Sequence, residues 1–188
     1  MFSRSQVQES ARHHGVLARL HADCSGSTIL EFAFVAGPFI ALILAILQTA
    51  LIFFSNQLLE TAAQSAARQI MTGTVQQANA GAGLTQAEFK TLTCSKLPDF
   101  MQCANLTVDV TKGTDFASAN TGSPAITYSG STPTFPNRYN IGDDNDVVVV
   151  RLMYPWSVVG APGLSLGSLQ NGKFLLMATS VAMTEPYK

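Results

Sequence analysis

The side chains that could do catalytic or metal chemistry are unevenly placed along this chain. All of the histidines precede Gly26, and they are His13, His14 and His21. No Ser-His or Cys-His nucleophilic pair can therefore form beyond Gly26. Cys94 and Cys103 also lack the histidines or further cysteines that a typical zinc site requires. The sequence accordingly predicts no enzyme, no catalytic residue, no metal centre and no cofactor.

A short acidic run, Asp143-Asp144-Asn145-Asp146, is the other group with possible metal chemistry. It could bind calcium loosely, but Val147 stands where an EF-hand loop would place its third oxygen ligand, and the bidentate glutamate is absent. The alternative, which we favour, is a solvated turn before a strand.

Cys94 and Cys103 are nine residues apart, which makes them plausible disulfide partners in an oxidising compartment. Closing a ring of about ten residues contributes roughly 2.5–3 kcal/mol in the chain-entropy model. The alternative is a pair of buried free thiols, because spacing alone does not establish the geometry of a disulfide.

The charge distribution predicts a membrane helix. No charged residue occurs from position 32 to position 59, whereas Arg4, Arg12 and Arg19 precede Gly26. A membrane-spanning helix needs about 20 apolar residues, so we place the span at about residues 32–54. The run is too long for a cleaved secretory signal, and no A-x-A-like site follows it. Positive residues before the span predict a cytoplasmic N-terminus, and the net charge of −1 argues against a nucleic-acid partner.

The elements that position these residues follow from periodicity. A helix is expected from about Ser27 to about Met71, with a kink rather than a break at Gly37-Pro38. Beyond the span, apolar residues recur with the spacing of one buried helical face, and they are Leu59, Ala62, Ala63, Ala66, Ala67 and Ile70.

The remainder predicts a small α+β domain with a short helix and a mainly antiparallel sheet. A polar connector at 73–83 leads to a capping box, Thr85 with Glu88, which opens a helix toward Cys94. The expected strands are 105–110, 146–154 and 173–183, with a short one near 126–128 inside a long loop at 112–140, and a connection at 155–172.

Glu31 needs its own explanation, because it lies among the apolar residues at the start of the predicted helix. One reading is that it marks the membrane interface, where a carboxylate near a helix N-terminus is stabilised by the helix dipole. An ionised carboxylate in lipid, however, costs several kcal/mol unless it is paired. A cut after Gly26 would create a Ser27 ammonium that could pair with Glu31 of a neighbouring subunit.

These residues resemble a known family. The stretch Gly26-Ser27-Thr28-Ile29-Leu30-Glu31-Phe32 resembles the class III signal of type IV pilin-like proteins. The following apolar run and its exit, "NQLLETAAQSAARQIMTG", are similar to TadE-like proteins of the tight-adherence pilus system.

The resemblance implies a pilin-like minor pilin or pseudopilin that initiates, caps or stabilises an adhesive filament. It implies cleavage by a prepilin peptidase between Gly26 and Ser27, and assembly with other pilins through the N-terminal helix at Glu31 and Phe32. The implied organisation is a cytoplasmic leader at 1–26, a helix at 27–73, and an extracytoplasmic domain at 74–188. The protein would sit in a bacterial inner membrane, with the lipid bilayer and the pilus assembly platform as further partners. The alternative function is an uncleaved single-pass anchor that acts as a periplasmic scaffold or sensor.

Overall fold

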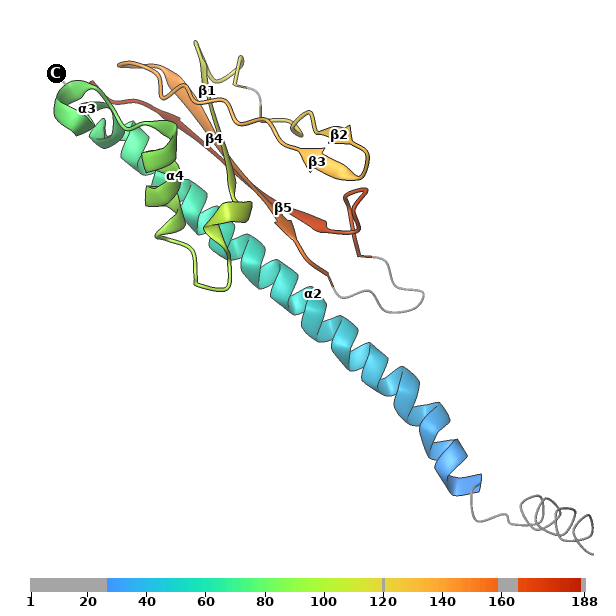
Figure 1. The fold of residues 1–188 in the computed structure, drawn as a ribbon. Helices are drawn as coiled ribbons and strands as arrows, with labels where there is room; N and C mark the ends of the chain where they lie inside the picture. The colour runs from blue at the N-terminus through green and yellow to red at the C-terminus, as the bar shows by residue number, and fades with distance from the viewer. Residues whose placement is uncertain (1–26, 120, 159–165, 187–188) are drawn as a thin grey trace, which may run out of the picture. The chain divides into compact units, whose positions relative to one another are not determined.

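The computed structural model describes residues 27–119, 121–158 and 166–186, so the predicted leader and Gly26 lie outside the described residues. The elements are α2 (Ser27–Met71), α3 (Thr74–Gly81), α4 (Gln86–Cys94), the 3-10 turn η2 (Cys103–Asn105), β1 (Thr107–Gly113), β2 (Thr127–Ser129), β3 (Thr132–Thr134), β4 (Val147–Trp156) and β5 (Phe174–Met183) (Figure 1). The chain divides into two compact units, residues 1–46 and 47–188, and α2 contributes to both. The α+β class is confirmed, since one long apolar helix precedes short helices and antiparallel sheets.

Helix α2 has the predicted bounds and two different surfaces. In the first unit its large apolar side chains are exposed, from Ile29 to Ile46. In the second unit the predicted face is buried in the core, with Leu59 and Ile70 fully covered and four alanines between them. Alanine favours helix and lets a neighbouring element approach closely, because its side chain is one methyl group. The second half of α2 therefore packs into the core, whereas the first half exposes an apolar surface that is long enough to cross a membrane.

The connector predicted at 73–83 is corrected in part by the structure, because this segment begins with a helical turn of α3 and its backbone leaves the helical conformation from Ala78 to Ala80. Gly73 has a φ of 71°, a left-handed conformation that ends α2 without the penalty of a Cβ atom. The chain then turns, and Val75 becomes completely buried in the core. Burial of the Val75 side chain fixes the position of this turn against the core. The polar composition of the segment did not indicate such a contact.

Helix α4 begins as its sequence predicted. The Thr85 hydroxyl accepts a hydrogen bond from the Glu88 amide, and the Glu88 carboxylate accepts one from the Thr85 amide at 2.8 Å. The Thr85 hydroxyl also donates a hydrogen bond to this carboxylate at 2.8 Å. The two bonds that the carboxylate accepts from Thr85 lower the pKa of Glu88, since each one favours the ionised form. The helix buries Phe89 against the core and ends at Cys94.

The main sheet has the order β1-β4-β5, and both strand pairs are antiparallel. Every residue from Val147 to Tyr154 in β4 is buried, which explains why this strand is apolar along its length except at Arg151. Alternate residues of β4, including Val148 and Val150, belong to the same core as the alanines of α2. The structure extends β4 through Pro155 to Trp156, beyond the predicted end.

A hairpin occupies part of the long loop, where one short strand was expected. Strands β2 and β3 pair antiparallel around Gly130, which has a φ of 60°. A left-handed residue at this position suits a two-residue hairpin turn, because it matches the twist of the flanking strands. The hairpin belongs to the segment that follows β1 and lies beside the main sheet (Figure 1).

Candidate functional site

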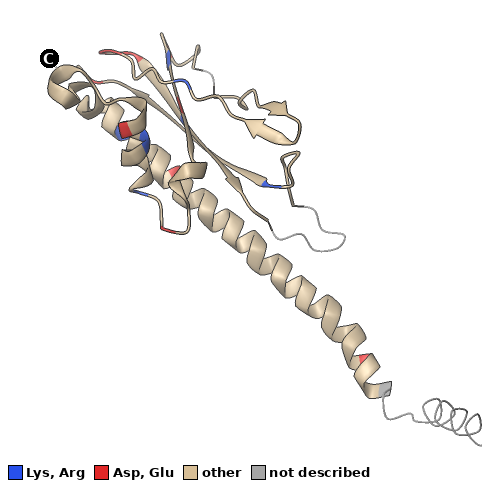
Figure 2. Cartoon of the chain, viewed as in Figure 1, with Lys and Arg blue, Asp and Glu red and all other residues tan. Residues whose placement is uncertain are grey.

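The predicted assembly residues lie near the beginning of α2. Helix α2 starts at Ser27, and Glu31 is exposed on a surface that is otherwise apolar. Its neighbours Leu30 and Phe32 are 63% and 73% exposed. Glu31 is the one charged position in the first part of α2 (Figure 2). The arrangement presents a single carboxylate within a broad apolar surface.

The position of Glu31 bears on the two explanations for it. The first turn of α2 contains no acidic residue, so Glu31 lies beyond the turn where the helix dipole acts most strongly. A carboxylate placed only to mark the start of the helix would gain more in that first turn. The pairing of Glu31 with a specific charge stays a prediction.

Gly37 and Pro38 lie inside α2, which continues through them without a break. A Cβ atom built on Gly37 would meet nothing within 4 Å. Nothing in the described chain therefore requires a glycine here, whereas small residues in membrane helices allow a second helix to approach closely. The bend predicted at this pair stays a prediction.

The predicted disulfide is present and joins Cys94 of α4 to Cys103 of η2, with 5.6 Å between the two Cα atoms. The loop that it closes also contacts the sheet, because the Gln102 amide donates a hydrogen bond to the Tyr154 hydroxyl at 3.1 Å. The disulfide thus holds α4 and the entry to β1 together at one edge of the domain.

The acidic run binds a cation that belongs to the chain itself. The Lys112 ammonium lies 2.8 Å from Asp146 and 3.4 Å from Asp143. These contacts raise the pKa of Lys112, and the hydrogen bond from Lys112 lowers the pKa of Asp146. Among the described residues no group of three or more acidic, histidine or cysteine side chains is arranged to hold a metal ion. The geometry favours the turn before β4 over the calcium site.

A buried ion-pair network was missed by the sequence reasoning. Asp109 on β1 lies opposite Arg151 on β4, and both are almost completely buried. The Asp109 carboxylate accepts hydrogen bonds from Arg138 at 3.0 Å (Nε) and 2.8 Å (Nη2), and from Arg151 Nη1 at 3.4 Å. Arg151 also donates to the Gly122 carbonyl at 2.9 Å. The network holds the segment between β1 and β4 against the sheet. The sequence feature that could have indicated it is the single arginine inside the apolar strand β4.

Comparison with known families finds one match over this site. Residues 26–68 match the family model described as TadE-like protein, and the match covers the whole apolar part of α2, Glu31 and the buried face as far as Ala67. No characterised protein and no solved structure matches the chain. Helix α2 is long and apolar enough to cross a membrane, and it fits a single-pass anchor.

Proposed function

We propose that this chain, which carries the TadE-like segment at residues 26–68, is a minor pilin or pseudopilin that assembles with other pilins of a tight-adherence pilus. The observation that carries the proposal is the division of α2. One half is built into the core of a small disulfide-linked domain, and the other half exposes apolar side chains around a single carboxylate. A helix of this kind can leave the bilayer into an assembly without disturbing the domain that it carries. In this role the protein contributes to a filament and catalyses no reaction.

The proposed orientation places residues 1–26 in the cytoplasm and residues 74–188 on the other side of the inner membrane. Two observations support it. Arginines precede the apolar span and none occurs within it. The disulfide lies after the span, as expected for a domain in an oxidising compartment.

Cleavage between Gly26 and Ser27 by a prepilin peptidase is the proposed maturation step. A glycine before the cut gives the peptidase an unhindered bond, because glycine has no Cβ atom. Cleavage would make Ser27 the first residue of the mature chain. It would also give the helix a new ammonium group four positions before Glu31.

Glu31 is the proposed assembly residue, together with the adjacent Phe32. In the assembled complex the Glu31 carboxylate would pair with the Ser27 ammonium of a neighbouring subunit, and Phe32 would pack between the helices. The exposed apolar surface around both residues supports this, because a charge pair excluded from water is strong where the dielectric constant is low. Such a pair would also fix the axial register between subunits. The assembly platform in the inner membrane would be the remaining partner.

The mature N-terminus tests the proposal. We expect N-terminal sequencing of protein from its native membrane to begin at Ser27, and Gly26→Leu to leave the precursor uncut. Gly37→Ala is the matched control, since a Cβ atom there contacts nothing in the described chain and should leave cleavage unchanged. A mature protein that begins at Met1 would instead select the uncleaved anchor with a scaffold or sensor role.

A further inference from the structure

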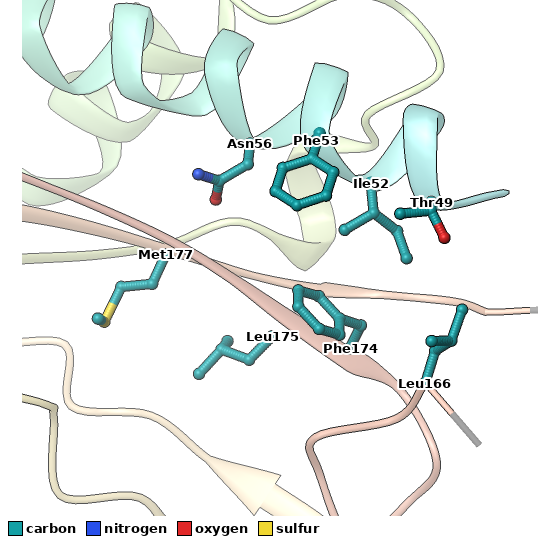
Figure 3. Close-up of a pocket in the computed structure, with 8 residues that line it drawn as sticks. All are labelled: Thr49, Ile52, Phe53, Asn56, Leu166, Phe174, Leu175 and Met177. Carbon is teal, nitrogen blue, oxygen red and sulfur yellow. The ribbon is translucent and has the colours of Figure 1, made fainter. Parts of the chain in front are cut away.

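An apolar pocket opens at one end of the second unit, between α2 and the beginning of β5 (Figure 3). Its volume is about 420 Å³, and its lining residues are Thr49, Ile52, Phe53, Asn56, Leu166, Phe174, Leu175 and Met177. Most of this lining is aliphatic or aromatic, with Thr49 and Asn56 as the polar exceptions. Pockets of a few hundred Å³ with such a lining commonly receive small apolar ligands.

Aromatic side chains continue from this pocket across the same end of the domain. Phe174 lies opposite Trp156 in the register of β4 and β5. The ring of Phe100 meets the Trp156 ring edge-on, with 6.1 Å between their centroids. Phe53 and Phe100 are 71% and 51% exposed. We call these four residues, Phe53, Phe100, Trp156 and Phe174, the aromatic base.

The length of α2 places the aromatic base relative to a bilayer. A hydrocarbon core of about 30 Å corresponds to about 20 helical residues at about 1.5 Å per residue. A span that begins at Ile29 therefore ends near Thr49, and one that begins at Phe32 ends near Ile52. Both of these end residues line the pocket. The pocket is thus carried by the turns of α2 that leave the hydrocarbon core.

The composition of this end suits the interfacial layer of a membrane. Tryptophan and other aromatic side chains concentrate at the level of the lipid headgroups, where one part of the ring is apolar and another can meet water. Lys173 directly precedes Phe174, and a lysine can extend its ammonium toward a phosphate while its methylene chain stays in apolar surroundings. Asp99 directly precedes Phe100. The aromatic base is therefore flanked by one positive and one negative side chain, and a zwitterionic headgroup likewise carries one charge of each sign.

We propose that the aromatic base rests in the headgroup layer of the membrane that α2 crosses, and that the pocket receives an acyl chain of a phospholipid. The proposal relies on the membrane anchoring contained in the proposed function, and it is independent of cleavage and pilus assembly. It adds a second membrane contact, made by the folded domain rather than by the span. That contact would hold the domain against the bilayer until the chain leaves it.

The protein contains its own reporter, because Trp156 is its one tryptophan. The full-length chain is placed in vesicles of phosphatidylcholine, and Trp156 emission is compared with that in phosphatidylcholine brominated near the headgroup end of its acyl chains. Bromine quenches tryptophan only at close approach. We expect roughly a twofold loss of emission in the brominated vesicles, and less when bromine is near the end of the chain. Flotation and alkaline extraction of the same vesicles measure anchoring independently.

Two variants with similar exposed rings sharpen the test. Phe100→Gln should reduce the quenching ratio, because it removes the aromatic side chain that lies beside Trp156. Phe116→Gln should leave the ratio unchanged, since Phe116 is 63% exposed but follows the opposite end of β1. Each variant is compared between brominated and ordinary lipid, so a change in intrinsic emission cancels.

Each result has a definite meaning. Protein that floats with the vesicles but shows equal emission in both lipids overturns the inference and leaves the anchor intact. Quenching that disappears as more protein is added per lipid shows that a second copy covers the base, and this also overturns it. Protein that does not float refutes both the anchor and the inference.

Discussion

Asp109→Asn removes the one negative charge of the buried network while nearly preserving the shape of the side chain. The Asp109 and Arg151 side chains are 1% and 3% exposed, so in the variant the guanidinium of Arg151 would stay buried after losing the Asp109 carboxylate. Breaking a buried pair in this way typically costs about 3–5 kcal/mol. For a domain of this size we expect the melting temperature to fall by roughly 10 °C. Arg138 contributes less to this penalty, because its side chain is 58% exposed and can be solvated.

The measurement is thermal and urea unfolding of the full-length protein in detergent, followed by Trp156 emission. Asp143→Asn is the matched control, since that carboxylate is 88% exposed and also contacts a basic side chain. We expect almost no change in the control, because exposed ion pairs contribute little.

A double variant tests the physical reasoning rather than the contact alone. Arg151→Met together with Asp109→Leu replaces the pair by apolar side chains, which is often close to neutral. We therefore expect the double variant to be more stable than either single variant. If Asp109→Asn melts like the wild type, or if the two single effects simply add, the buried pair is not the source of the stability.

Three further predictions concern other parts of the chain. Alkylation of the mature protein without reductant should leave Cys94 and Cys103 unmodified, and complete labelling of both cysteines would contradict a disulfide. The double variant Cys94→Ser with Cys103→Ser should lower the free energy of unfolding in urea by about 2.5–3 kcal/mol. Because the folded-state pKa of Asp146 is below its ordinary value, the stability from this residue is present above about pH 4 and is lost as the pH falls through the folded pKa. Urea midpoints measured between neutral and acid pH should therefore fall less steeply for Asp146→Asn than for the wild type, and equal slopes would show that this carboxylate is not involved. Glu31→Gln should keep membrane insertion and cleavage but lose crosslinking to partner pilins, since removing one member of a pair in low dielectric costs about 3–5 kcal/mol; Glu60→Gln is its control, and normal assembly of Glu31→Gln would leave Glu31 as a residue at the start of the helix.

Local patterns predicted α2, α4 and the main strands. The uncharged run and the spacing of apolar residues from Leu59 to Ile70 predicted helix α2. Both patterns involve residues only a few positions apart, so they can be read from the sequence alone. The capping box at Thr85 is likewise complete within four residues. Strands β4 and β5 were evident because their apolar runs are long. The spacing of Cys94 and Cys103 predicted the disulfide. Its geometry could not be predicted, because it depends on the fold placing the end of α4 next to η2.

Contacts between distant residues could not be predicted in the same way. Asp109 and Arg138 are far apart in a loop-rich segment, so no periodicity connects them. Lys112 reaches Asp146 only because β1 pairs with β4 in the observed register. Helix α3 was missed because its place depends on the burial of Val75 in a core assembled from the rest of the domain. The aromatic base has the same origin, since Phe53, Phe100 and Trp156 are brought together only by the fold.

The order of elements along the chain determines when the domain can close during synthesis. The amide of Glu185, just after β5, donates a hydrogen bond to the carbonyl of Met71 at the end of α2, and α2 and β5 both supply the core. About 100 residues separate these two elements, which at about 5–20 residues per second corresponds to a delay of roughly 5–20 s. Until β5 is made, the alanine-rich face of α2 lacks the complete three-stranded sheet of the folded domain. Completion of the fold therefore waits for β5, and a chain stalled before β5 would expose part of an apolar helix to chaperones and proteases.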